Sequence, residues 1–84
     1  MGATPDVEAK VARLVAVEMK TTEARVRHVR SFRRELGMDS ISAANLLFAV
    51  EEHYGIELDP DSVGGIDSLA EVTAAVVLAL EGEA

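Results

Sequence analysis

Residues 39–55 read DSISAANLLFAVEEHYG, and this stretch carries the clearest helix signals in a chain of 84 residues. Asp39 suits the N-cap position, because its short carboxylate can accept a hydrogen bond from a free N–H group of the first turn. Gly55 suits the position after the last turn, where the backbone often takes a left-handed conformation. Between them the spacing of apolar residues predicts a helix over about 39–54.

The predicted helix is apolar on two sides. At about 100° of rotation per residue, its broad stripe consists of Leu46, Leu47, Val50 and Tyr54. The opposite side carries a second stripe, which consists of Ile41, Ala44, Asn45, Phe48 and Glu52, with Glu51 at its rim. Two interpretations are open: a small bundle buries this helix nearly all round, or the second stripe is an exposed docking patch for partner proteins.

Helix signals also occur on both sides of this stretch. Thr4 as a cap and Pro5 at the first helical position predict a helix over about 5–19. Ser68 and Glu71 have the spacing of a capping box and predict a last helix over about 67–81. The turn-rich segment after Gly55 predicts one short helix near 61–65.

Residues 20–38 are expected to form a long connection. Connections of this length are usually functional or contain short helical turns of their own. The residues expected to contact the core are Val26, Val29, Phe32 and Leu36. No alternation of apolar and polar residues runs far enough to require a sheet. The sequence therefore predicts an all-α fold, a single domain over residues 1–84 built as a small bundle of three long helices plus one short helix.

The composition excludes several classes of protein. With no Cys, the chain has no disulfide, thiolate metal site or cysteine nucleophile. A net charge of −7 argues against nucleic acid as the main partner, since phosphate binding requires a basic surface. The N-terminus lacks a secretory signal and the longest apolar run, 74–80, is too short to span a membrane, so the cytoplasm is the expected location. A self-contained enzyme is not expected at this size.

The charge is distributed unevenly along the chain. The first 34 residues hold all eight Lys and Arg residues and four acids, a net +4, whereas residues 35–84 hold eleven acids and no Lys or Arg, a net −11. Either both halves are simply solvated, or the acidic half meets basic partners while the Arg-rich segment 25–34 makes a separate contact. The sequence does not decide between these interpretations.

The segment ELGMDSI, residues 35–41, leads into the middle helix and places Ser40 on its first turn. Free backbone N–H groups and the positive end of the helix dipole favour a negative group attached to a hydroxyl at that position. Plain capping is a common reason for Asp-Ser before an apolar run at a helix start. On Asp39, Ser40 and Ile41 alone, plain capping is the favoured interpretation.

The wider context of this motif resembles acyl carrier proteins. The passages SFRRELGMDSI (31–41), EEHYGIEL (51–58) and IDSLAEV (66–72) are similar to that family, and the resemblance runs without gaps from about Val11 to Leu80. It implies an acyl-carrier-type bundle in which Ser40 carries 4′-phosphopantetheine, with Asp39 as the adjacent motif residue. A phosphopantetheinyl transferase would supply coenzyme A and Mg²⁺ for the transfer. The chain itself would not be an enzyme, and its lack of Cys agrees with a thiol supplied by the prosthetic group.

Other candidate sites in the sequence are weaker. Ser68 lies in a second Asp-Ser-Leu motif, but it lacks the Leu-Gly lead-in and has a Glu at capping-box distance. Residues 59–70 imitate a calcium loop in which two positions that need oxygen ligands are apolar. His28 and His53 lie far apart and have no ligand spacing. No metal site is expected.

Departures from the family pattern indicate the kind of carrier. Carriers of primary fatty-acid synthesis usually place acids just after the serine and along the exposed side of the second helix, where this chain has Ser42 and Asn45. The resemblance therefore favours a stand-alone, monomeric carrier of polyketide or specialised-lipid assembly over one of fatty-acid synthesis. Its expected partners are enzymes such as a ketosynthase, acyltransferase or ligase, which would dock on the second stripe. The alternatives are an aminoacyl or peptidyl carrier protein and an unmodified helical interaction module.

Overall fold

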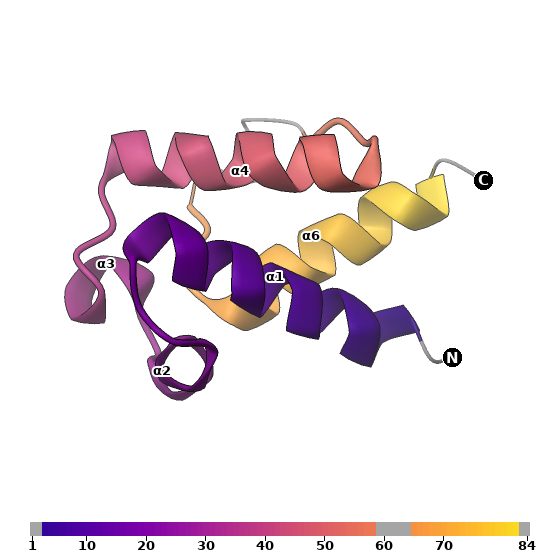
Figure 1. Cartoon of the computed structure of the whole chain (residues 1–84). Coiled ribbons are helices and arrows are strands. Elements are labelled where there is room, and N and C mark those ends of the chain that lie inside the picture. The colour runs from indigo at the N-terminus through magenta and orange to yellow at the C-terminus, as the bar shows by residue number, and fades with distance from the viewer. Residues whose placement is uncertain (1–2, 59–64, 83–84) are drawn as a thin grey trace.

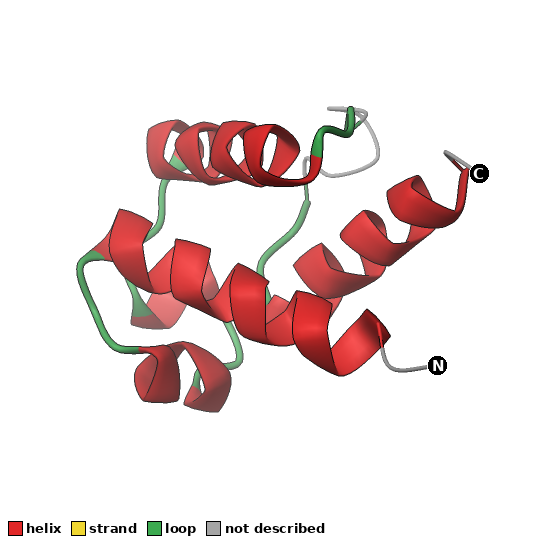
Figure 2. Cartoon of the chain, turned by 45° about the vertical axis from the view of Figure 1, so that its right-hand side comes forward, coloured by secondary structure: helices red, strands yellow, loops and turns green. Residues whose placement is uncertain are grey.

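A computed structural model of the chain describes residues 3–58 and 65–82. In this described part all regular structure is helical, which confirms the all-α prediction (Figures 1 and 2). The helices are α1 (Ala3–Met19), α2 (Glu23–His28), α3 (Phe32–Glu35), α4 (Ser40–Tyr54) and α6 (Leu69–Gly82). The short helix expected near 61–65 falls mainly on residues that lie outside the described part.

The three long helices form the body of the molecule. α1 packs mainly against α6 and α4, and it runs opposite in direction to α4 (Figure 1). The short helices α2 and α3 close the end of the bundle at which α1 ends and α4 begins. The first residue of α4 is thereby brought to one end of the bundle.

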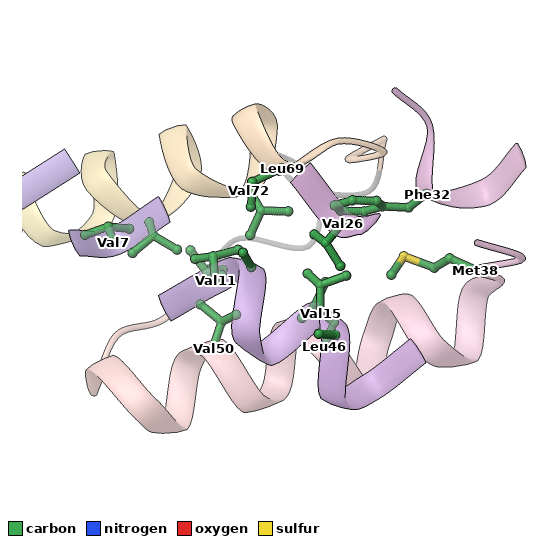
Figure 3. Close-up of a cluster of buried hydrophobic side chains, with 14 of the residues drawn as sticks. Val7, Val11, Val15, Val26, Phe32, Met38, Leu46, Val50, Leu69 and Val72 are labelled. Carbon is green, nitrogen blue, oxygen red and sulfur yellow. The ribbon is translucent and has the colours of Figure 1, made fainter. Parts of the chain in front are cut away.

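The core lies where the inner faces of these helices meet. Figure 3 shows side chains from α1, α2, α3, α4 and α6 converging on one apolar cluster. Val11, Val15, Leu46, Val50 and Val72 are buried in it. Leu46 and Val50 belong to the broad stripe predicted for the middle helix. Beta-branched and leucine side chains of this kind pack densely, so the interior contributes most of the folding free energy.

The prediction of residues 20–38 as one connection is incomplete, because the segment contains α2 and α3. Thr22 caps α2 by accepting a hydrogen bond from the Arg25 N–H at 3.1 Å. Ser31 caps α3 in the same way, accepting from the Arg34 N–H at 3.1 Å. The core contacts of the segment are as predicted: Val26, Val29 and Phe32 are buried and Leu36 is partly buried.

Helix ends agree with the predictions to within about two residues. α1 begins at Ala3, two residues before the predicted start, so Thr4 lies inside the helix and is not its cap. Pro5 is tolerated there because the first four N–H groups of a helix have no partner within it. At the start of α6, Ser68 Oγ accepts from the Glu71 N–H at 3.3 Å, while the Glu71 carboxylate accepts from the Asp67 N–H at 2.7 Å.

Candidate functional site

The start of α4 is fixed by a capping box between Asp39 and Ser42. Asp39 Oδ1 accepts from the Ser42 N–H at 2.9 Å and from the Ser42 Oγ–H at 2.7 Å. Ser42 Oγ in turn accepts from the Asp39 N–H at 3.2 Å. The predicted cap at Asp39 is confirmed, and the backbone direction at the entry of α4 is fixed with it.

Ser40 is the first residue of α4 and its side chain is exposed. Within the described part of the chain its hydroxyl makes no hydrogen bond that would have to be broken before it reacts. Two residues earlier, Met38 is buried at 4% exposure, and its N–H donates to the Phe32 carbonyl at 3.1 Å. Gly37 allows this turn, since its φ of 74° is a conformation that side-chain-bearing residues rarely adopt. Ser40 therefore exposes its hydroxyl two residues after Met38, whose side chain is fixed in the core.

The negative charge of Asp39 already lies at the positive end of α4. Hydrogen bonds from the Ser42 side chain and backbone hold the pKa of Asp39 below its ordinary value. One N–H group of the first turn is already used, because the Ser42 N–H donates to the Asp39 carboxylate. The Ala43 N–H makes the first bond of the helix itself, to the Asp39 carbonyl.

The second stripe of α4 is exposed. Ile41 is 72% and Phe48 is 61% exposed, and Ala44, Asn45 and Glu52 are exposed as well. The opposite stripe supplies Leu46 and Val50 to the core. The interpretation that the bundle buries this helix nearly all round is therefore wrong, and two large apolar side chains face outward along one line.

Asn45 of the second stripe and Glu51 at its rim have partners within the chain. Glu51 is only partly exposed, and its carboxylate accepts from the Leu58 N–H at 2.7 Å, which ties the segment after α4 back onto the helix. Asn45 donates to the Glu18 carboxylate of α1 at 3.4 Å. Of the two glutamates expected at the docking patch, Glu52 is the more accessible.

Asp67 connects the segment before α6 to the segment before α4, and sequence analysis missed this role. Its carboxylate accepts from the Ser31 Oγ–H and, at 2.8 Å, from the Arg33 N–H, while its carbonyl accepts from the Phe32 N–H at 2.7 Å. These bonds, the Ser31 side chain first, hold the pKa of Asp67 below its ordinary value. We call Asp67 and residues 31–33 the Asp67 clamp. No local sequence signal indicates it, because its two sides lie more than 30 residues apart.

The arginines of segment 25–34 make several contacts within the molecule. Arg25 Nη2 donates to the Glu35 carbonyl at 3.0 Å, and Arg27 Nη1 lies 2.9 Å from the Glu8 carboxylate. Arg33 Nε lies 3.9 Å from the Asp67 carboxylate. The Glu35 carboxylate accepts from the Arg30 N–H at 2.6 Å and from the Ser31 N–H at 3.1 Å, and these bonds lower the pKa of Glu35. The segment is thus tied into the fold at several points.

The remaining candidates are accounted for by the structure. Ser68 is partly buried, and its hydroxyl accepts the capping bond from Glu71, as predicted for a structural residue. His28 and His53 are both exposed. Among residues 3–58 and 65–82, no three His, Asp or Glu side chains gather closely enough to hold a metal ion. The described helices include none that is long and apolar enough to cross a bilayer.

The described chain is a helical bundle that exposes an unengaged serine at the start of its middle helix, with an apolar stripe beside it, as the resemblance to small helical carrier domains predicts. The family model described as "Phosphopantetheine attachment site" matches residues 9–76. The chain therefore belongs to this family, that of the acyl carrier proteins, and phosphopantetheine is its cofactor.

Curated relatives agree with this assignment. The chain is 31% identical over 68 residues to the acyl carrier protein of Nitratidesulfovibrio vulgaris, which covers 81% of this chain and 90% of that protein. It is 26% identical over 76 residues to acyl carrier protein 3 of Ralstonia nicotianae, which covers 90% of this chain and 87% of that protein. Each match spans most of this chain and most of the relative.

Proposed function

We propose that this chain is an acyl carrier protein in which Ser40 receives 4′-phosphopantetheine from coenzyme A. The observation that carries the proposal is the exposed Ser40 hydroxyl, which is free of hydrogen bonds in the described structure and stands at the start of α4. The cofactor supplies the terminal thiol on which acyl groups are held as thioesters. The chain has no Cys of its own for that purpose.

The residues around Ser40 fit the attachment of such a group. An exposed position gives a long, flexible arm freedom to reach several enzymes, and tethering raises the local concentration of the acyl group at each active site. Met38 and the capping box of Asp39 and Ser42 fix the base of the arm relative to α4. In this arrangement the chain holds and presents the acyl group, and partner enzymes carry out the chemistry.

The second stripe is the surface on which we expect these enzymes to dock. Exposed Ile41 and Phe48 supply apolar contacts beside Ser40, and Ala44, Asn45 and Glu52 surround them. The neutral Ser42 and Asn45 support a polyketide or specialised-lipid pathway, with enzymes such as a ketosynthase, acyltransferase or ligase as partners. A cytoplasmic location and a monomeric state stay predictions.

Mass spectrometry of the intact protein tests the attachment site. The unmodified protein is incubated with coenzyme A, Mg²⁺ and a broad-specificity phosphopantetheinyl transferase. We expect a gain of one phosphopantetheine group in the wild type and in Ser68→Ala, and no gain in Ser40→Ala. A wild-type protein that stays unmodified would favour the unmodified interaction module, and a gain that persists in Ser40→Ala would move the site elsewhere.

A second experiment separates the kinds of carrier. The protein that carries phosphopantetheine is offered acyl groups, such as malonyl and fatty acyl groups, in one reaction and amino acids in another. Each reaction contains a matching activating or transferring enzyme. Transfer of acyl groups alone supports the proposal. Transfer of amino acids alone would favour the aminoacyl or peptidyl carrier.

A further inference from the structure

The two serines at the start of α4 have different roles. Ser42 makes three hydrogen bonds with Asp39, one of which joins the Ser42 Oγ–H to the Asp39 carboxylate. We propose that Ser42 is a positioning residue for the loading of Ser40. It holds the Asp39 carboxylate against the first turn of α4, and the Ser40 hydroxyl therefore stays free to accept the phosphopantetheine group. This inference rests on the proposed function.

The first step of the argument is a competition for the Asp39 carboxylate. An ionised carboxylate is a strong hydrogen-bond acceptor, and a neighbouring hydroxyl donates to it readily. Ser40 follows Asp39 directly in the chain and would be such a donor. In the structure Asp39 Oδ1 instead accepts from the Ser42 N–H at 2.9 Å and from the Ser42 Oγ–H at 2.7 Å. Ser42 thus fixes the orientation of the carboxylate through Oδ1, and in this orientation no hydrogen bond joins the carboxylate to the Ser40 hydroxyl.

The second step is that, among the described residues, Ser42 is the main hydrogen-bond partner of the Asp39 carboxylate. Residues 35–84 contain no Lys or Arg, so no cation on α4 or α6 can pair with Asp39. In the described part of the chain, both hydrogen bonds to the Asp39 carboxylate come from Ser42, with a weaker attraction from the Ile41 backbone. Loss of the Ser42 hydroxyl therefore leaves the Asp39 carboxylate held by backbone groups alone and open to the Ser40 hydroxyl.

The third step is the chemistry of loading. A bond forms between Ser40 Oγ and the phosphorus that bears the pantetheine group in coenzyme A, and the bond from that phosphorus to adenosine 3′,5′-bisphosphate breaks. The Ser40 proton passes to a base of the transferase, and the bisphosphate leaves with its bonding electron pair. A Ser40 hydroxyl that donates to Asp39 would have to break that bond before its proton could pass to the transferase. An exposed hydroxyl that donates only to water gives up a weaker bond than one that donates to a carboxylate.

Loading rates of three variants test the inference. Ser42→Ala removes the hydroxyl, Ser42→Thr keeps it, and Ser68→Ala removes a comparable capping hydroxyl from α6, far from Ser40 in the sequence. With coenzyme A, Mg²⁺ and a broad-specificity transferase, we expect kcat/KM for Ser42→Ala to fall by about five- to tenfold, the effect of one hydrogen bond. Ser42→Thr and Ser68→Ala should stay within about twofold of the wild type.

A ¹³C NMR titration of the Asp39 carboxyl in the unmodified protein gives a readout that does not depend on transfer. Because the Ser42 bonds lower the pKa of Asp39, Ser42→Ala should raise that pKa toward its ordinary value, and Ser42→Thr should restore the lowered value. A Ser42→Ala protein that loads as fast as the wild type overturns the inference, and so does an equal slowing in Ser68→Ala. Failure of every protein, wild type included, to gain the group would instead refute the proposed function.

Discussion

The Asp67 clamp makes a stability prediction that can be worked out from its contacts. Substitution of Asp67 by Asn keeps the shape of the side chain but removes its charge, and it leaves one oxygen for two donors, the Ser31 hydroxyl and the Arg33 N–H. A hydrogen bond to a charged group contributes about 1.5–3 kcal/mol, and partial exposure of Asp67 reduces this. We expect Asp67→Asn to lower the free energy of unfolding by about 1–2 kcal/mol.

The way in which this stability difference changes with pH follows from the lowered pKa of Asp67. The folded state lowers the pKa of Asp67, so its contribution is fully present above the unfolded pKa of about 3.9 and is lost as the pH falls through the folded pKa. The stability difference between wild type and Asp67→Asn should therefore be constant between about pH 5 and 7 and shrink below about pH 4.

Urea or thermal unfolding followed by circular dichroism measures this difference. A loss of about 1–2 kcal/mol corresponds to a fall in Tm of roughly 5–15 °C for a domain of this size. Glu52→Gln is a matched control, because Glu52 is an exposed acid outside the clamp. Equal stability of Asp67→Asn and wild type at pH 7 would refute the reasoning, and so would a difference that persists unchanged near pH 2.5.

Two further predictions concern the exposed face and the C-terminal end of α4. Phe48→Asp should lower the rate at which a transferase loads Ser40 by roughly tenfold, as for the loss of a central apolar contact. The helical content should stay unchanged, because Phe48 is 61% exposed. Loss of the helical signal in circular dichroism would show that the second stripe is part of the core. Gly55→Ala should cost about 1–2 kcal/mol in urea unfolding, because Gly55 has a φ of 65°. No atom lies within 4 Å of a Cβ built at position 55, so the cost comes from the backbone conformation, and a full loss of the fold would contradict this explanation. Gly55→Asn should cost less than Gly55→Ala, because Asn is also found at this left-handed position.

The parts of the fold that the sequence predicts are those with local causes. The helix from Ser40 to Tyr54 begins after Asp39 and ends before Gly55, since a cap and a left-handed glycine act within one turn of the chain. Its two stripes also predict which side faces the core. What periodicity does not supply is the choice between a buried and an exposed second stripe, because that depends on how many helices pack around α4.

The parts that the sequence missed depend on distant contacts. α2 and α3 have six and four residues, too few for a helical period to be recognised. Their positions depend on burial of Val26 and Phe32 and on Asp67, which is brought to residues 31–33 only by the fold. At the site, Ser40 and Asp39 are predictable from the motif, whereas the bonds between Asp39 and Ser42 emerge only when the first turn of α4 is built.

The contacts of the arginines change the interpretation of the charge distribution. A basic first half and an acidic second half can indicate two separate docking faces, but Arg25, Arg27 and Arg33 each contact an oxygen of the chain itself. Exposed pairs of this kind contribute little stability one by one. Several of them, together with the Asp67 clamp, fix the backbone of a segment whose regular structure is limited to two short helices, α2 and α3. Because this segment ends in the turn at Met38, its order helps to determine where Ser40 stands, so these arginines support the site.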